Sequence, residues 1–281
     1  MYNKNMLNKL LPLTKQFIAI KSTFDNQKDL DKALALALSN LQEFTVEEFE
    51  SNGVKSALVF NTKKRPTKFK IILNGHLDII PGNDSQHQAL IKKDRLVGVG
   101  ALDMKASVAC LITTFKEVAN KVRYPLALQL TTDEEIGGFN GTKFQIDKGV
   151  RANFVIAGEP TNLNIVNSAK GILCLKITCK GKTSHGAYTW KGENAIWKMN
   201  KFLNILEKKF PIPASEKWKT TVNLSKIETH NNSFNKIPDD CRVWLDIRFI
   251  PEDKNKILKK LTKLAPRNFN FEVIVNEPST Y

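Results

Sequence analysis

Apolar and polar positions alternate along the chain with a period that changes from segment to segment. Apolar residues recur every three or four positions in four segments, which predicts helices at 28–44, 105–122, 194–210 and 253–264. Apolar runs or strict alternation predict strands at 56–60, 70–80, 126–134, 153–160, 171–182, 220–229, 240–250 and 268–276. Helices and strands that alternate in this way indicate an α/β protein.

The order of these elements divides the chain in two. Before about residue 165, strands and helices alternate as in an open α/β sheet. After Ala169 the order becomes βαββαβ, which is that of a ferredoxin-like domain. We expect the boundary at residues 165–170, with a first domain at 1–168 and a second at 169–281.

Acidic and imidazole side chains follow the apolar runs of the first domain. They occur in "GHLD", "GALDMK", "TTDEEIGG" and "GEPT", and they are His76, Asp78, Asp103, Asp133, Glu134, Glu135 and Glu159. The carboxyl ends of neighbouring parallel strands meet in one crevice, so these side chains should lie close together. Carboxylates gathered in this way either have raised pKa values or bind cations, and mixed histidine and carboxylate ligands suit zinc or a similar ion.

Each of these features alone has a simpler interpretation. His76 and Asp78 could form a hydrogen-bonded turn pair, the three carboxylates at 133–135 could lie in a solvated loop, and Glu159 could point into water. The "GVG" of 98–100 is a turn and does not open a dinucleotide-binding unit. The prediction of a metal site therefore depends on the four segments occurring together in this order.

The net charge of +15 changes this picture little. Lysine outnumbers arginine 36 to 7, and the lysines are scattered instead of forming one stripe with aromatic residues. The densest cluster, at 61–70, is interpreted as a solvated turn, with a nuclear-localisation signal or a phosphate-binding patch as the alternatives. We therefore expect no nucleic-acid partner; nucleic-acid binding would predict an affinity that falls steeply with salt.

No apolar run reaches the roughly 18 residues of a membrane span, and the start of the chain lacks a signal-peptide core. We expect a cytoplasmic protein with no membrane partner. The four cysteines show no metal-finger spacing, and Cys174 and Cys179 should lie on opposite faces of one strand, so we expect reduced thiols.

The six ordered motifs "GHLDIIP", "GVGALDMKAS", "TTDEEIGG", "GEPT", "GKTSHGAYTWKGENAI" and "NKIPDDCRVWLDIR" together are far more specific than any one of them. In this order they resemble the co-catalytic zinc metallopeptidase family that includes acetylornithine deacetylase, succinyl-diaminopimelate desuccinylase, aminoacylase and glutamate carboxypeptidase. The resemblance implies that 1–168 is the N-terminal part of an α/β/α catalytic domain. It also implies that 169–281 is a ferredoxin-like lid, through which the protein would form a homodimer.

The resemblance also implies a role for each residue of the set. His76 and Glu159 would hold one zinc, Asp103 would bridge two, and Glu135 would hold the second, with cobalt or manganese as alternative metals. The peptide bond between Asp103 and Met104 would be cis.

Two further carboxylates would assist the metals. Asp78 would accept the second ring N–H of His76 and fix its tautomer. Glu134, next to a metal ligand, would be the general base that takes a proton from a zinc-bridging water and passes it to the departing amine.

The lid would contribute His185, which stabilises the oxyanion in the active site of the partner subunit, and Asn235 and Arg248, which bind a substrate carboxylate. The alternatives are a surface turn for His185 and pairing of Arg248 with Asp246 or Asp240.

Two departures from the family pattern bear on activity. "YTW" at 188–190 replaces a proline that the family often has there. No histidine follows His230, although the resemblance implies a last histidine ligand after the lid, so we expect an incomplete second metal site and uncovered apolar surface on the catalytic layer. Either the chain is a fragment of a longer product, or it is a shortened relative.

Two functional hypotheses follow. The first is a metal-dependent hydrolase that cleaves an amide next to a free carboxylate, in an N-acyl amino acid or small peptide, with desuccinylase or deacetylase activity as the first guesses. The second is a catalytically inactive relative that acts as a binding or assembly protein.

Overall fold

The structure, a computed structural model, describes residues 4–280. By its internal contacts the chain divides into two compact units, Met1–Leu163 (unit 1) and Asn164–Tyr281 (unit 2). Both mix helices with sheets, so the predicted α/β class is confirmed. Whether 1–168 and 169–281 fold as separate domains stays a prediction.

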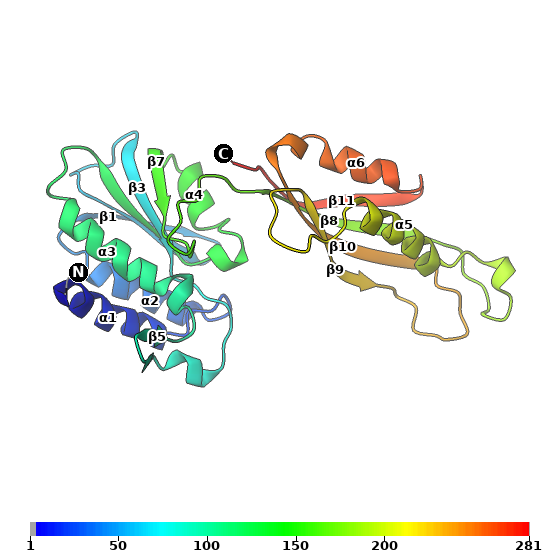
Figure 1. Cartoon of the computed structure of the whole chain (residues 1–281), viewed down its shortest axis with the longest axis horizontal. Coiled ribbons are helices and arrows are strands. Elements are labelled where there is room, and N and C mark those ends of the chain that lie inside the picture. The colour runs from blue at the N-terminus through cyan, green and yellow to red at the C-terminus, as the bar shows by residue number, and fades with distance from the viewer. Residues whose placement is uncertain (1–3, 281) are drawn as a thin grey trace. The chain divides into compact units, whose positions relative to one another are not determined.

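Unit 1 is built on a mixed sheet (Figure 1). Its helices are α1 (Lys4–Ala19), α2 (Gln27–Ser39), α3 (Ala106–Val118) and α4 (Thr142–Asp147). Its strands are β1 (Thr45–Ser51), β2 (Val54–Phe60), β3 (Phe69–His76), β4 (Leu90–Lys92), β5 (Arg95–Val97), β6 (Leu126–Thr131) and β7 (Ala152–Ala157). The larger sheet has the order β1-β2-β6-β3-β7, in which β3 is parallel to both β6 and β7.

The central strands of this sheet are buried on both faces. Helices α1, α2 and α3 cover one face and pack on side chains such as Leu73 and Leu128. On the other face Phe60, Phe69 and Ile72 form a smaller cluster against which α4 places Phe144. Strands covered on both sides read as continuous apolar runs, which is how β3 and β6 could be located in the sequence.

The edge strand β7 differs from its neighbours because its apolar side chains are uncovered. Phe154, Val155 and Ile156 are 62%, 54% and 43% exposed. Successive residues of a strand point to opposite faces, so β7 presents apolar surface on both. This is exposed apolar surface of the kind expected on the catalytic layer.

Unit 2 has the predicted βαββαβ order. Its elements are β8 (Gly171–Lys180), α5 (Ala195–Lys209), β9 (Thr221–Glu228), β10 (Asp240–Phe249), α6 (Ile257–Leu264) and β11 (Phe269–Glu277). The antiparallel sheet has the order β11-β8-β10-β9, and α5 and α6 pack on the side chains of one face. Cys179 is buried on that face, Cys174 lies on the other, and all four cysteines are free thiols, as expected.

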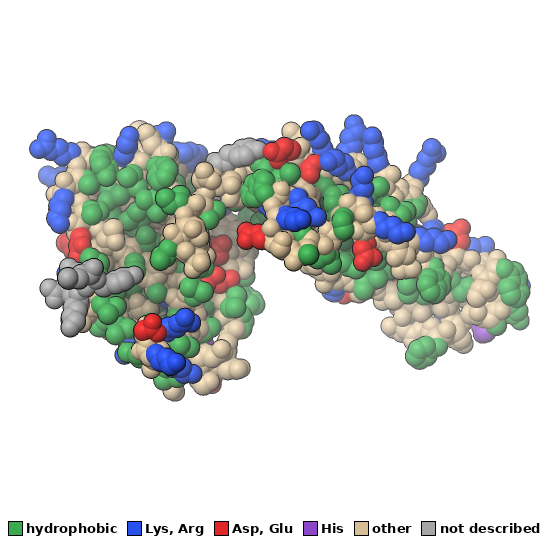
Figure 2. Space-filling model, in the orientation of Figure 1, with side chains coloured by type: hydrophobic (Ala, Val, Ile, Leu, Met, Phe, Trp, Pro, Cys, Tyr) green, Lys and Arg blue, Asp and Glu red, His purple; other side chains and the backbone are tan. Residues whose placement is uncertain are grey.

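The surface charge is dispersed. Figure 2 shows Lys and Arg side chains scattered over the visible face, with acidic, hydrophobic and neutral polar side chains between them. None of the helices within residues 4–280 is both long and apolar enough to cross a bilayer.

Candidate metal centre

Three parallel strands end at the same edge of the unit 1 sheet. His76 is the last residue of β3 and is level with Thr131, the last residue of β6. A short helical turn, Glu134–Ile136, follows β6, and Glu159 follows β7. The predicted convergence of these polar segments results from the parallel pairing.

Asp103 reaches this edge from an irregular turn, Ala101–Lys105, that precedes α3. The turn begins after Gly100, whose φ of 68° lies in the left-handed region that favours glycine. The peptide bond between Asp103 and Met104 is cis, as the resemblance implied. Met104 is fully buried, and its sulfur accepts the main-chain N–H of His76 at 3.4 Å, which anchors the turn beside β3.

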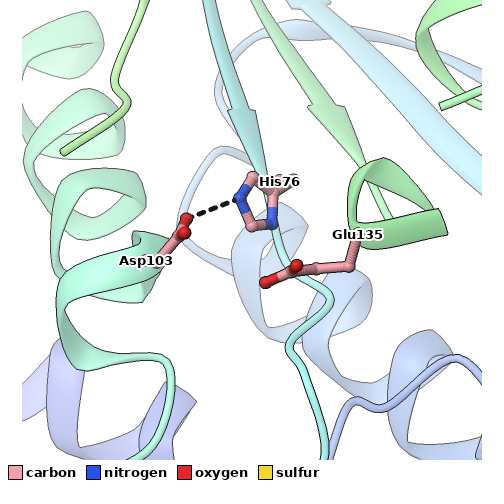
Figure 3. Close-up of side chains that lie close together, drawn as sticks. All are labelled: His76, Asp103 and Glu135. Carbon is pink, nitrogen blue, oxygen red and sulfur yellow. Dashed lines mark hydrogen bonds and ion pairs between the residues drawn. The ribbon is translucent and has the colours of Figure 1, made fainter. Parts of the chain in front are cut away.

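The side chains of His76, Asp103 and Glu135 point toward one another (Figure 3), and one potential ligand atom from each lies within 4.8 Å of the others. His76 Nε2 lies 3.0 Å from Asp103 Oδ1. The same nitrogen is 3.8 Å from Glu134 Oε2 and 3.9 Å from Glu159 Oε2. This imidazole nitrogen therefore faces three carboxylates, of which Glu134 and Glu159 lie outside the compact group of His76, Asp103 and Glu135.

Asp78 is fully buried and connects two of these residues. Its main-chain carbonyl, at 3.0 Å, is closer to His76 Nδ1 than its carboxylate, which is 3.5 Å away. The resemblance implied that the carboxylate would accept this N–H, so the closest acceptor differs from the expected one. The carboxylate instead accepts the main-chain N–H of Glu135 at 2.8 Å and so fixes the start of the acidic turn. With Nδ1 donating to this carbonyl, Nε2 is the ring nitrogen that faces the carboxylates, and in the neutral ring its lone pair would be available to a metal ion.

The close approach of these acidic side chains and His76 shifts their pKa values. Burial first, and then the charges of neighbouring carboxylates, raise the pKa values of Glu134, Glu135 and Glu159. Burial lowers the pKa of His76, but the hydrogen bond and charge of Asp78, with the charges of Glu159 and Glu134, outweigh it and raise the pKa to about 9. Without a cation the group therefore retains protons, which a divalent ion would replace.

Asp133 belongs to the same run of carboxylates but has a different place. Its side chain is 1% exposed, and its Oδ2 accepts the main-chain N–H groups of Asn140 and Gly141 at 2.8 and 3.0 Å. Burial raises its pKa. Asp133 thus holds the loop that follows Glu134 and Glu135, a role that its place in the sequence does not reveal.

The burial of Lys105 could not be predicted from the sequence either. Its side chain is fully buried, its Nζ donates to the main-chain carbonyl of Ile20 at 2.7 Å, and burial lowers its pKa to about 7. In the sequence it is one of 36 lysines, and nothing distinguishes it from a solvated one.

The candidate residues of unit 2 fall into two places. His185 and Asn235 are exposed and lie on adjoining loops, because the main-chain N–H of Gly186 donates to the carbonyl of Asn235 at 2.6 Å. The Nδ1 of His185 accepts the main-chain N–H of Ala187 at 3.1 Å.

Arg248 lies at the opposite end of the unit 2 sheet. It is level with Ile172 near the start of β8, whereas the loop that carries His185 follows the end of β8. Its guanidinium pairs with Asp246, with Nε 2.9 Å from Oδ1, which is one of the alternatives left open by the sequence.

The donor set fits a divalent metal ion. One imidazole nitrogen and one carboxylate oxygen each from Asp103 and Glu135 lie within 4.8 Å of one another, a spacing that a single cation could bridge. Asp78 Oδ1 is buried without a hydrogen-bond partner, 3.5 Å from Nδ1 of His76. A buried carboxylate oxygen that lacks a donor is unusual and fits a site that a nearby cation would complete.

The chain is similar to known proteins over most of its length. A family model described as the M20 peptidase dimerisation domain matches residues 167–269. Over 294 residues the chain is 29% identical to succinyl-diaminopimelate desuccinylase of Pelagibacter ubique, and the alignment covers 95% of this chain and 77% of that protein.

The chain is therefore similar to members of the M20 peptidase family. It is also 32% identical over 220 residues to acetylornithine deacetylase of Myxococcus xanthus, which covers 74% of this chain and 56% of the relative. The chain thus spans only part of the length of each M20 relative.

Solved structures share the fold. The M20 metallo-carboxypeptidase Sso-CP2 of Sulfolobus solfataricus superposes with a TM-score of 0.74 at 17% identity, covering 97% of this chain and 79% of that one. The aminopeptidase PepT of Bacillus cereus gives 0.72 at 20% identity, with 97% and 77% covered.

Proposed function

We propose that the protein is a metal-dependent amidohydrolase that cleaves an amide bond next to a free carboxylate, in an N-acyl amino acid or a small peptide. The observation that carries the proposal is the compact group of His76, Asp103 and Glu135, with a further carboxylate, Glu134, beside the same imidazole. The names of the M20 relatives, which include a desuccinylase and a deacetylase, agree with this class of reaction.

In this proposal His76, Asp103, Glu135 and Glu159 hold two divalent metal ions, with zinc as the first choice because imidazole and carboxylate ligands suit it. Bound metal supplies Lewis acidity, which polarises the scissile carbonyl and acidifies the attacking water. Asp78 orients His76 through its main-chain carbonyl and holds Glu135 through its carboxylate.

Glu134 is the general base in this reaction. Its carboxylate accepts a proton from water as the water oxygen bonds to the acyl carbon, and it returns that proton to the amine nitrogen as the carbon–nitrogen bond breaks. Two features support the assignment: Glu134 lies beside the group of three, and its side chain is 52% exposed, so it can reach a substrate.

Glu134→Gln tests this assignment directly, since glutamine keeps the size of the side chain but cannot accept the proton. We expect the variant to keep its metal content and to hydrolyse a panel of N-acyl amino acids about 10²–10⁴-fold more slowly than the unmodified chain. A chain that binds at most one metal and hydrolyses none of the panel before the substitution would instead support a non-catalytic binding protein.

We further propose a cytoplasmic homodimer formed through unit 2, supported by the dimerisation-domain match and the free thiols. His185 would stabilise the oxyanion in the site of the other subunit, and Asn235 and Arg248 would bind the substrate carboxylate. Because Asn235 and Arg248 lie at opposite ends of the unit 2 sheet, the two residues at one site would come from different subunits. Arg248 pairs with Asp246 through one edge of its guanidinium, and its other edge has the geometry for a second carboxylate.

Subunit mixing tests this arrangement. A heterodimer of Glu134→Gln and His185→Ala chains contains one site with both groups intact if His185 acts across the interface. We expect two inactive variants to regain activity on mixing; no recovery would place His185 in the site of its own subunit or outside the reaction.

A further inference from the structure

A buried lysine links the two segments that carry the closest pair of potential ligands. Lys105 ends the turn that holds Asp103, its side chain is 0% exposed, and its Nζ donates to the carbonyl of Ile20 at 2.7 Å. A buried amine is costly unless it is hydrogen-bonded. Its placement inside unit 1 therefore calls for a structural reason.

The segment that receives this hydrogen bond also holds the end of β3. Ser22, which is fully buried, donates its hydroxyl to the carbonyl of Leu77 at 2.7 Å. Its own carbonyl accepts the main-chain N–H of Ile79 at 3.0 Å. These two bonds flank Asp78 and follow directly on His76.

Residues 20–22 therefore act as a clasp between the two segments. One side of the clasp holds the strand end that carries His76, and the other side is held by Lys105 next to the turn of Asp103. Gly100 fills the space between them so closely that a Cβ there would lie 2.3 Å from Ile79 and 3.3 Å from Lys105. Little room is left for the turn to shift.

We propose that Lys105 is a positioning residue for the metal centre: through Ile20 and Ser22 it fixes the distance between His76 and Asp103. The amine can donate to the carbonyl whether or not it is protonated, so this role needs the N–H group and not a particular charge. The inference rests on the proposed function, because it assigns Lys105 to the same metal site.

Lys105→Met removes the donor and keeps the length of the side chain. We expect its affinity for Zn²⁺, measured by competition with a chromophoric chelator, to fall about tenfold or more. The visible absorption of the Co²⁺-loaded protein, which reports ligand geometry, should change as well.

Lys116→Met is the matched control. Lys116 lies on the adjacent helix α3 and donates to the carbonyl of Asn40 at 2.7 Å, away from the metal centre. We expect its Zn²⁺ affinity and Co²⁺ spectrum to match those of the unmodified chain. Equal losses in the two variants would show a general effect on stability and would overturn the proposal.

Ser22→Ala removes the hydrogen bond from the Ser22 hydroxyl to the Leu77 carbonyl and is a smaller change than Lys105→Met. It tests the same proposal if the Lys105→Met variant does not fold. We expect a weaker Zn²⁺ affinity here too; an unchanged affinity and spectrum would overturn the proposal. An unmodified chain that binds no Zn²⁺ or Co²⁺ would refute both the proposed function and this inference. An unmodified chain that binds metal, with variants that bind equally well, would refute the inference alone.

Discussion

Gly141→Ala should destabilise unit 1 by placing a methyl group against the buried carboxylate of Asp133. An ideal Cβ at Gly141 would lie 2.2 Å from Asp133 Oδ1 and 3.0 Å from the Cβ of Thr131. The carboxylate cannot turn away freely, because its other oxygen holds the N–H groups of Asn140 and Gly141.

The two possible responses bound the cost. If the carboxylate stays, overpacking costs about 1–3 kcal/mol. If it turns, two hydrogen bonds to a charged acceptor are lost, each contributing about 1.5–3 kcal/mol. The smaller loss determines the outcome, so we expect the free energy of unfolding of unit 1 to fall by about 1–3 kcal/mol.

A double-mutant cycle with Asp133→Ala isolates this contact. In that background the carboxylate is gone, so Gly141→Ala should cost less than in the unmodified chain, and the difference, up to about 3 kcal/mol, is the coupling energy of the contact. Hydrogen exchange of the β6 amides reports unit 1, and tryptophan fluorescence reports unit 2, since all four tryptophans lie in it. Additive costs for the two substitutions would refute the reasoning.

Three further outcomes can be measured on the same protein. Asp103→Asn should abolish the rise in melting temperature that excess Zn²⁺ gives the unmodified chain, a stabilisation of about 2.7 kcal/mol at one hundred times the dissociation constant; an equal rise in both would remove Asp103 from the site. Burial lowers the pKa of His87, so the folded state disfavours its protonated form. Its contribution to stability is therefore complete above the unfolded pKa of about 6.5 and is lost as pH falls below it, by at most about 1.4 kcal/mol per pH unit; His87→Gln should flatten this part of the urea-unfolding profile, and parallel profiles would contradict the assignment. Cys179 and Cys241 are 0% exposed and should react with a thiol reagent only after unfolding. Rapid reaction of all four thiols in the native chain would contradict this prediction.

The strands that carry the site could be predicted because parallel pairing buries them on both faces. Such strands read as apolar runs, and the polar residue that follows each run marks the edge where they meet. The antiparallel edge strand β1, "TVEEFES", escaped prediction because only Phe49 of its side chains is buried. Its alternation of polar and apolar residues is too weak to separate it from a loop.

The features of the site that the sequence did not reveal depend on where each side chain points and on which acceptor lies closest to it. Asp133 and Glu134 are adjacent carboxylates, and only the backbone turn after β6 decides that the first points inward and the second outward. The hydrogen bond from His76 goes to a main-chain carbonyl, which every residue possesses. The pairing of Arg248 with Asp246 was foreseen only as one alternative, because residues two apart on a strand share a face with many possible partners.

The carboxylates and the histidine of the candidate metal centre lie at strand ends, in the segments after β6 and β7, or in the turn before α3. The interior of the sheet supplies apolar packing and backbone pairing. Scaffold and reactivity are therefore encoded by largely different positions. Evolution can adjust the rim of such a site without altering the register of the strands. One architecture can in this way serve proteins that remove a succinyl group in one organism and an acetyl group in another.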